Sequence, residues 1–342
     1  MRLSENVLKE LAQLAETERT VLSVYLDIRM DPKIIQRFIK RESAKLLRVL
    51  NRNEKDHFET SLSFMQDYLK EKQAKTSPEP GIAFFADIGA DFTKGIELSV
   101  APEPLIAIDD EAIIHPLALQ LDEYEPIGVI MVDASCMRVL ITAGEIIESK
   151  DSLCRKIHHL SKVGGWSQMR YQRRRDKEVM HFSREIIEKA GAVFDAVGVQ
   201  RIVVAGRDRM ISALEREFPA GWQKKVIAVI RWDLDHADGE FLKKVRPFLE
   251  KAEREQEKNL LALFISELRR GGLAAEGEER TRKALKIGQV DTLLISQGLD
   301  TDLTEELTSL AKQTGAQVEF VPELNQTLRQ FDGIAALLRF NI

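Results

Sequence analysis

Two adjacent glycines, followed by a tryptophan, a serine and a glutamine, stand in the segment VGGWSQMRYQRRRDK, residues 163–177. Gly164 and Gly165 allow positive φ angles and let the backbone approach a partner with no Cβ in the way. Ser167 is placed to cap a following helix, whose first N–H groups would favour an anion. Trp166 could stack on a nucleobase. The segment is therefore a candidate for contact with a nucleic acid.

The helix expected after these glycines carries a basic face. Its basic side chains recur at helical spacing: Arg170, Arg173, Arg174, Lys177 and His181. Nine basic and two acidic residues lie between Lys150 and Lys177, a net charge of +7 in a chain whose total is −5. Such a patch directs a polyanion to one place. We expect RNA to contact Trp166 and six basic residues: Lys162, Arg170, Arg173, Arg174, Arg175 and Lys177.

A glycine-rich turn before a solvated basic helix is the simpler interpretation of the same segment. The glycines, the aromatic residue, the glutamine and the basic face nevertheless converge at one place. We therefore favour the functional interpretation.

The elements around this segment are predicted to form a mixed sheet. IGVIMVDASCMRVLITAGEIIES reads as a strand meander with turns at Asp133 and Gly144. A helix is expected from about Ser167 to Ala190, because its apolar residues keep helical spacing. RIVVAG, MISALEREF and VIAVIRWD then alternate strand and helix, which indicates helices packed on a sheet.

The rest of the chain predicts two further α/β regions. The first opens with a helix and the strand VLSVYLDI, followed by one or two long helices over residues 34–69 and three short strands. The last starts near His236 with a long charged helix and then repeats helix, glycine turn and strand. The expected fold class is α/β, with mixed sheets and flanking helices in three domains. These are an N-terminal α/β domain (1–124), a middle domain (125–237) and a C-terminal α/β/α sandwich (238–342).

Composition narrows the class of protein. No run approaches the roughly 20 apolar residues of a membrane span, and the N-terminus lacks the apolar core of a signal peptide. We expect a soluble, cytoplasmic protein with no membrane contact. Cys136 and Cys154 are the only cysteines, so neither a disulfide framework nor a thiolate zinc site is expected, and both are interpreted as small packing residues.

Other candidate sites are weaker. Asp133 could serve as a metal carboxylate, but no partner carboxylate is obvious and a turn residue is the favoured interpretation. The acidic cluster around His236 is explained more simply by solvation of a domain linker. Val204-Ala-Gly206 lacks the remaining glycines of a nucleotide-binding loop. We expect no metal and no cofactor.

The segment VGGWSQMRYQRRRDKEVMHFSREI resembles the tip of the middle domain of archaeal and eukaryotic class I peptide chain release factors. In that family a Gly-Gly-Gln loop precedes a helix that carries arginines. VGVQRIVVAGRDRMISALE looks like a later unit of the same domain, and TRKALKIGQVDTLLISQGL looks like the ribosomal-protein-like third domain. The N-terminal region is most similar to bacterial members of the superfamily. The resemblance implies a release-factor-like middle domain and a ribosomal-protein-like sandwich at the C-terminus.

Two departures from the family pattern bear on function. Trp166 stands where the family has its glutamine, and Gln168 follows two residues later, as in the Gly-x-x-Gln loop of release-factor-like peptidyl-tRNA hydrolases of ribosome quality control. The Asn-Ile-Lys-Ser motif that reads stop codons in the eukaryotic family is absent from residues 1–124. Hydrolysis without decoding is therefore the expected activity.

The resemblance implies that Gly164, Gly165 and Gln168 hydrolyse the peptidyl-tRNA ester. Backbone N–H groups beside the glycines would stabilise the oxyanion, and the Gln168 amide would orient water without titrating. The implied partners are the ribosome, at the peptidyl transferase centre of the large subunit, and tRNA, with a translational GTPase left open. A non-catalytic ribosome-binding factor for rescue or hibernation is the main alternative. A binder of structured RNA that uses its C-terminal domain is the third.

Overall fold

Three β-sheets, each flanked by helices, organise the computed structural model, which describes residues 3–14, 20–74, 79–123, 126–133, 135–143, 146–154, 166–236, 238–323 and 325–340. Backbone packing divides the chain into a terminal unit, Met1–Glu123 with Glu257–Ile342, and a middle unit, Tyr124–Gln256. The prediction of an α/β fold with mixed sheets and flanking helices is confirmed. Within the described ranges, none of the helices combines the length and the apolar character needed to cross a membrane.

The middle unit is built on a five-stranded mixed sheet of order β7-β6-β5-β8-β9. Its strands are β5 (Ile127–Val132), β6 (Cys136–Ala143), β7 (Ile146–Cys154), β8 (Arg201–Gly206) and β9 (Val226–Arg231). β5, β6 and β7 pair antiparallel and form the predicted meander, whereas β5, β8 and β9 pair parallel. The parallel half of the sheet is fully buried at β5 and β8, as is typical of strands covered on both faces.

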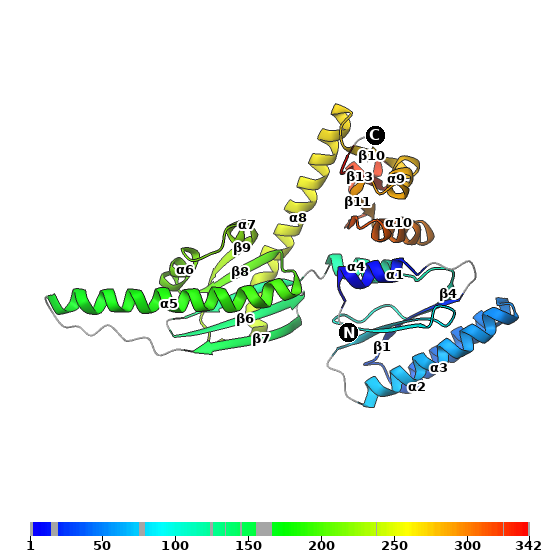
Figure 1. Ribbon diagram of the computed structural model, residues 1–342, viewed down its shortest axis with the longest axis horizontal. Helices are drawn as coiled ribbons and strands as arrows, with labels where there is room; N and C mark the ends of the chain where they lie inside the picture. Colours follow the sequence, from blue (N-terminus) through cyan, green and yellow to red (C-terminus); the bar gives the residue numbers. More distant parts are fainter. Residues whose placement is uncertain are drawn as a thin grey trace. The chain divides into compact units, whose positions relative to one another are not determined.

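Helices cover both faces of this sheet. Three helices pack on one face: α5 (Trp166–Val197), α6 (Asp208–Glu215) and α7 (Trp222–Lys225) (Figure 1). On the other face the first part of α8 (Asp238–Arg270) buries Phe241 and Val245. β5 serves both faces, because Ile130 joins the first cluster and Val129 the second. The two clusters together contain buried residues from β5, β6, β8 and β9.

One glycine sets how closely α5 approaches the sheet. A Cβ built on Gly128 of β5 would lie 2.5 Å from the ring atom Cζ of Phe194, which α5 buries. No such contact is tolerated, so only glycine lets the end of α5 lie against β5. Phe194 in turn packs on Trp222, with ring centroids 5.5 Å apart.

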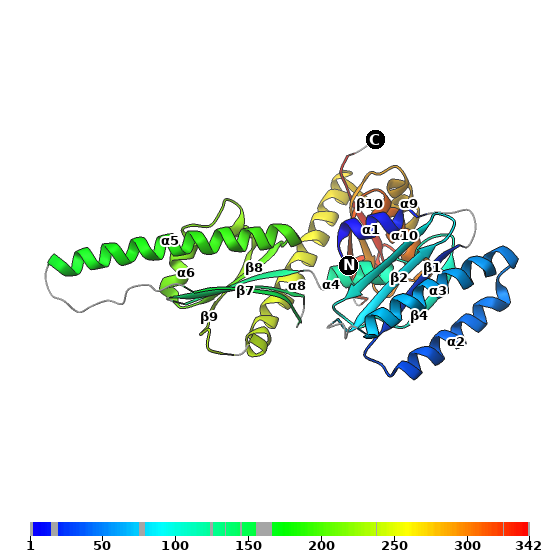
Figure 2. The same cartoon turned by 60° about the horizontal axis from the view of Figure 1, so that its bottom comes forward.

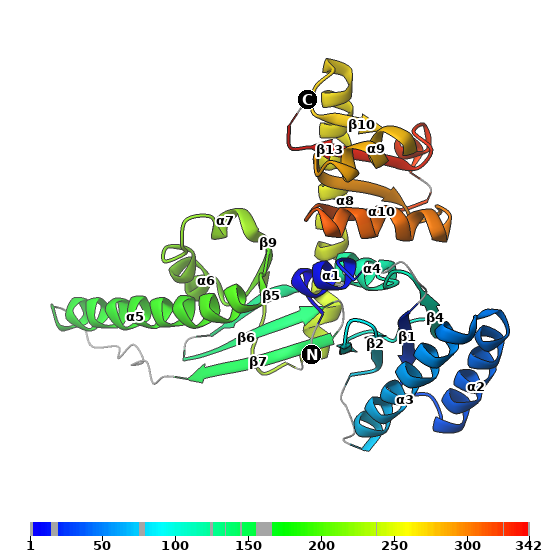
Figure 3. The same cartoon turned by 45° about the vertical axis from the view of Figure 1, so that its right-hand side comes forward.

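The first sheet of the terminal unit is antiparallel, with order β3-β2-β1-β4. Its strands are β1 (Val21–Asp27), β2 (Gly81–Asp87), β3 (Phe92–Leu98) and β4 (Leu105–Asp109). α2 (Pro32–Val49) and α3 (Arg52–Ala74) cover one face through a cluster that includes Leu26, Ile35 and Phe58 (Figure 3). α1 (Glu5–Ala12) and α4 (His115–Glu123) pack in a second cluster with Tyr25 and Phe85.

The second sheet of the terminal unit has order β10-β13-β11-β12 and forms the predicted α/β/α sandwich. Its strands are β10 (Ala274–Glu276), β11 (Val290–Ser296), β12 (Gln317–Val321) and β13 (Ile334–Leu338). α9 (Gly277–Lys286) and α10 (Thr301–Gln313) pack with the cluster that also holds α1 and α4. The end of α8 and α11 (Gln326–Arg329) pack with a separate cluster that includes Phe264 and Leu328.

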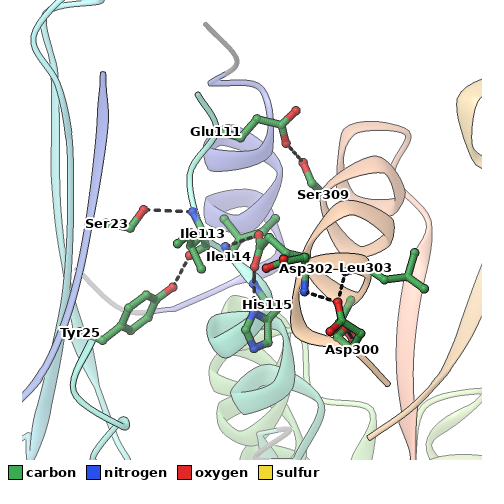
Figure 4. A network of polar contacts seen from close by, with 12 residues as sticks. Ser23, Tyr25, Glu111, Ile113, Ile114, His115, Asp300, Asp302, Leu303 and Ser309 are labelled. Carbon is green, nitrogen blue, oxygen red and sulfur yellow. Dashed lines mark hydrogen bonds and ion pairs between the residues drawn. The ribbon is translucent and has the colours of Figure 1, made fainter. Parts of the chain in front are cut away.

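Polar contacts join the two ends of the chain within the terminal unit (Figure 4). Glu305 of α10 accepts hydrogen bonds from the backbone N–H groups of Ile114 and His115, at 2.6 and 2.9 Å. The Tyr25 hydroxyl donates to the Ile113 carbonyl at 2.6 Å. Burial, with a smaller contribution from the charge of Glu305, raises the pKa of Tyr25 well above its ordinary value. The N-terminal and C-terminal sheets therefore share one core and one polar seam.

The three sheets lie within residues 1–124, 125–237 and 238–342, and we retain that division into domains as a proposal. The expectation that Cys136 and Cys154 are separate packing residues is wrong, because the structure joins them in a disulfide. The register of β6 and β7 places Cys136 directly opposite Cys154, with 4.0 Å between the Cα atoms. Their separation of 18 residues carried no sign of this pairing, which depends on the strand register.

Candidate nucleic-acid interface

The N-terminal part of α5 reaches past the sheet that anchors the rest of the helix (Figure 2). Val179 is the first buried side chain described along α5, and the described side chains from Met169 to Glu178 are exposed or half-buried. We call Trp166–Glu178 the arm of α5. At 1.5 Å per residue it is about 20 Å long. Since none of the described side chains of the arm is buried in a core, their packing does not explain its length.

The arm presents the predicted basic face to solvent. All five residues of the face are exposed: Arg170, Arg173, Arg174, Lys177 and His181. Arg174 contacts Glu178 at 3.2 Å. Within the described part of the chain, no acidic side chain pairs with Arg170, Arg173 or Lys177. Arg175 is half-buried and, five positions after Arg170, falls away from that face.

Besides the pair between Arg184 and Glu217 at 2.7 Å, two ion pairs among the described residues hold α5 to its neighbours. Asp176 on the arm contacts Arg209 of α6 at 3.0 Å. Lys189 on the packed part of α5 contacts Asp151 of β7 at 3.1 Å. The hydrogen bond from Lys189, followed by that from the Ser152 backbone N–H, lowers the pKa of Asp151. Both pairs use side chains outside the basic face, so the face itself stays open.

The glycines and Lys162 lie outside the described residues, as do His158 and His159. Trp166 and Gln168 are the first and third residues of α5, and their side chains are not described. Ser167 is the second helical residue rather than the N-cap, because α5 starts one residue earlier than expected. In the sequence, Gly165 directly precedes Trp166, the first residue of the arm. The structure does not test what Gly164, Gly165 and Gln168 do.

The weaker candidates have structural roles. The Asp133 carboxylate accepts hydrogen bonds from the backbone N–H groups of Ser135 and Cys136, at 2.7 and 2.6 Å. This confirms the turn interpretation for Asp133. Asp233 is held by Arg207 at 2.8 Å, and that hydrogen bond lowers the pKa of Asp233. Among the residues described, no cluster of His, Cys, Asp and Glu has the arrangement of a metal site.

Sequence reasoning missed the cross-strand disulfide between Cys136 and Cys154. Cys154 is exposed, ends β7 and is the last described residue before α5 begins at Trp166. The disulfide therefore links the end of β7, where the chain leaves the sheet, to the start of β6. The sequence shows only two cysteines on either side of a predicted turn. It does not determine the register of the two strands that carry them.

Comparison with protein families finds two matches that meet end to end. Residues 113–257 match the family model described as bacterial archaeo-eukaryotic release factor family 10. Residues 255–342 match the model of eRF1 domain 3. The first match contains the arm of α5, and the second contains the C-terminal sandwich.

Individual relatives agree with these models along most of the chain. Peptide chain release factor subunit 1 of Pyrococcus abyssi is 25% identical, with 98% of this chain and 97% of that protein covered. The protein of the same name from Archaeoglobus fulgidus is 27% identical, with 71% and 74% covered. Among solved structures, an archaeal Pelota described as ribosome-bound with ABCE1 aligns at 13% identity and a TM-score of 0.49, covering 100% of this chain and 95% of that one.

Proposed function

The chain is a member of the release-factor superfamily, to which two family models assign residues 113–342, and we propose that it is a ribosome-associated peptidyl-tRNA hydrolase. It acts in ribosome rescue or quality control, without decoding a stop codon. The relatives named peptide chain release factor support the ribosomal setting. The proposed partners are the large ribosomal subunit, at its peptidyl transferase centre, and tRNA, with a translational GTPase as a further candidate.

The observation that carries this proposal is the exposed, basic arm of α5 with Gly165 directly before its outer end. An arm about 20 Å long can carry a short catalytic loop away from the body of a protein and into a narrow site. Arg170, Arg173 and Lys177 have no acidic partner within the described residues. Their guanidinium and ammonium groups are free to contact phosphates of ribosomal RNA or tRNA.

The proposed reaction uses water as the nucleophile. Its oxygen adds to the ester carbonyl that joins the peptide to the tRNA, and the bond to the ribose oxygen then breaks. A proton passes to that oxygen, which leaves free tRNA and a peptide with a new carboxyl group. Backbone N–H groups beside Gly164 and Gly165 stabilise the negative charge on the carbonyl oxygen. The Gln168 amide orients the water molecule, because it can donate and accept at once.

Peptide release from a purified complex of peptidyl-tRNA and large ribosomal subunit tests the proposal. We expect the wild-type chain to release peptide, and Gln168→Ala and Gly165→Ala to slow release by about 10²–10³-fold, the usual cost of losing a group that positions or stabilises the transition state. Two matched controls lie on the same helix. Gln172 is exposed on the arm and Gly191 is in its packed part, so Gln172→Ala and Gly191→Ala should release peptide at the wild-type rate.

A non-catalytic ribosome-binding factor is the second candidate. Trp166, in the position where the release factors carry glutamine, favours it. Co-sedimentation with ribosomes distinguishes the two, since both functions require binding but only the hydrolase releases peptide. Wild-type protein that co-sediments and releases no peptide would establish the second function and exclude the first.

A further inference from the structure

We propose that α2 of the terminal unit carries a second RNA-binding surface, which contacts the phosphate backbone through its outward basic face. Six basic residues and one acidic residue, Glu42, lie in α2. The basic residues are all exposed and, apart from the adjacent pair Lys40 and Arg41, follow one another at three or four positions: Lys33, Arg37, Lys40, Arg41, Lys45 and Arg48. We call this set the α2 row. It runs about 22 Å along the helix axis.

Packing orients this row. Ile35 and Ile39 are buried against the first sheet, so the opposite side of α2 faces solvent. The start of the helix is held by Asp31, whose carboxylate accepts the Lys33 backbone N–H at 2.7 Å. Because Ile35 and Ile39 are already buried, the basic side of α2 is the one that faces a partner in solution.

Charge pairing on α9 and in the middle of α8 provides a comparison for the α2 row. In α9, Arg280, Arg282 and Lys283 each contact a glutamate four positions earlier, at 2.7–3.2 Å. The middle of α8 is paired in the same way: Arg246, Lys251 and Arg254 each contact a glutamate. Such i, i+4 pairs are the ordinary way to solvate a charged helix.

The α2 row departs from that pattern. Glu42 contacts Arg41 at 2.7 Å and Lys45 at 2.8 Å. Within the described part of the chain, no acidic side chain pairs with the other four residues of the row: Lys33, Arg37, Lys40 and Arg48. A net acidic protein that leaves four neighbouring cations unpaired on one rigid face presents a local site for a polyanion.

RNA fits this face better than an acidic peptide. Arg37 and Arg41 do border an apolar pocket of about 200 Å³, together with Met30, Ile34 and Phe38, and such a pocket could hold an apolar side chain. The row, however, extends beyond the pocket to Arg48, and regularly spaced phosphates match it along its whole length. The contacts that we propose are to phosphates, so we expect the surface to bind the RNA backbone without sequence preference.

The test measures binding of a fluorescein-labelled 20-base-pair RNA duplex to the full chain. All variants carry Arg170→Gln, Arg173→Gln and Lys177→Gln, so that the arm of α5 contributes little. Adding Lys33→Gln, Arg37→Gln, Lys40→Gln and Arg48→Gln should weaken binding on the order of 10- to 100-fold near 0.1 M salt. It should also flatten the dependence of log Kd on log salt concentration by about 3, since each lost phosphate contact removes a little under one unit.

A matched control removes paired charges instead. Arg280→Gln, Arg282→Gln and Lys283→Gln on α9 should leave Kd within about twofold, because those cations are already neutralised by glutamates. Equal loss from the α2 and α9 variants would overturn the proposal, as would an α2 variant with unchanged Kd and salt dependence. Polyglutamate that binds through the α2 row while RNA binding is unaffected would assign the surface to an acidic protein instead.

The result of the duplex-binding test does not depend on the proposed hydrolase function. Peptide release from the large-subunit complex at saturating protein, with the arm intact, does not depend on the α2 row. Variants of the row that lose duplex binding and still release peptide support both proposals. A wild-type chain that fails to release peptide leaves the duplex measurement fully informative.

Discussion

α5 and α8 are nearly the same length, 32 and 33 residues, and use that length differently. α8 buries Phe241 near its start and Phe264 near its end, each in a core of its own. α5 buries nothing described before Val179. A helix that is longer than the surface it packs on exposes its excess turns to solvent without the stabilisation of a core, and in α5 those turns carry the basic face.

The same two helices differ in how they balance charge. The middle of α8 pairs its arginines and lysine with glutamates one turn away. Arg170, Arg173 and Lys177 on the arm have no such partner within the described residues. The length of the two helices and their charge pairing therefore lead to the same distinction. α8 is a structural helix, and α5 is a structural helix with an added arm, which we propose contacts RNA.

The largest expected effect separates the packed part of α5 from its arm. Phe182 is fully buried, and Phe182→Ala should lower the free energy of unfolding by about 3–5 kcal/mol. Met169 on the arm is 51% exposed, so Met169→Ala should change it by less than about 0.5 kcal/mol. Urea unfolding followed by tryptophan fluorescence measures both, because all three tryptophans lie in the middle unit. Similar losses for the two variants would show that the arm is packed.

The second-largest expected effect tests whether the basic residues of the arm bind the ribosome. Arg170→Gln, Arg173→Gln and Lys177→Gln together should weaken binding to large ribosomal subunits on the order of 10- to 100-fold near 0.1 M salt. The matched variant Arg246→Gln, Lys251→Gln and Arg254→Gln on α8 removes the same net charge from paired positions. We expect it to bind like the wild type in a sedimentation assay. If both variants bind equally weakly, total charge and not the arm governs binding.

A smaller effect probes the packed part of α5. A Cβ at Gly191 would lie 3.8 Å from the Trp222 ring, an ordinary contact, so Gly191→Ala should raise the free energy of unfolding by about 0.5–1 kcal/mol through helix propensity. Gly128→Ala, which places a Cβ against Phe194, should lower it by about 1–3 kcal/mol. Thermal unfolding detects opposite shifts. A destabilising Gly191→Ala would mean that this part of α5 is not a continuous helix.

The smallest effect depends on pH. The Lys189 hydrogen bond lowers the pKa of Asp151 below its ordinary 3.8. The ion pair therefore stabilises the folded state in full above pH 3.8, and this contribution is lost as the pH falls through the lower folded pKa. Both side chains are more than a third exposed, so Asp151→Asn should cost a few tenths of a kcal/mol at pH 7.

Urea midpoints at pH 6 and pH 3 measure this difference between Asp151→Asn and the wild type. We expect the difference to shrink at the lower pH. Asp195→Asn, an exposed acid on the same helix, is the control and should show no such change. A difference that is the same at both pH values would contradict the ion-pair explanation.

Periodicity predicted the elements of this fold better than their ends. The apolar spacing predicts a helix that ends at about Ala190, but α5 continues through Gly191 to Val197. Phe194 packs against Gly128 and Trp222, and this burial outweighs the propensity of one glycine. The turns of α5 beyond Ala190 depend on a contact with a strand more than sixty residues earlier. No local sequence pattern contains that contact.

Contacts between distant parts of the chain could not be predicted from the sequence for the same reason. Glu305 bonds to His115 across 190 residues, and nothing in either segment indicates the other. The disulfide between Cys136 and Cys154 follows from a strand register that alternation alone leaves open. The basic face of the arm was predictable, because helical spacing defines it. It was not predictable that Arg170, Arg173 and Lys177 have no acidic partner among the described residues, since that depends on where the acidic residues of other elements lie.

The shared core of the terminal unit sets the order in which parts of the chain can fold during synthesis. Val21 and Leu98 come from the first third of the chain, whereas Leu293 and Leu307, in the same cluster, come from the last sixth. The middle unit has all of its strands before residue 232. It can therefore fold while the chain is still being made, whereas the N-terminal sheet must wait for the C-terminal residues to close its second core. A chain truncated near residue 256 would keep its arm and leave half of that core exposed.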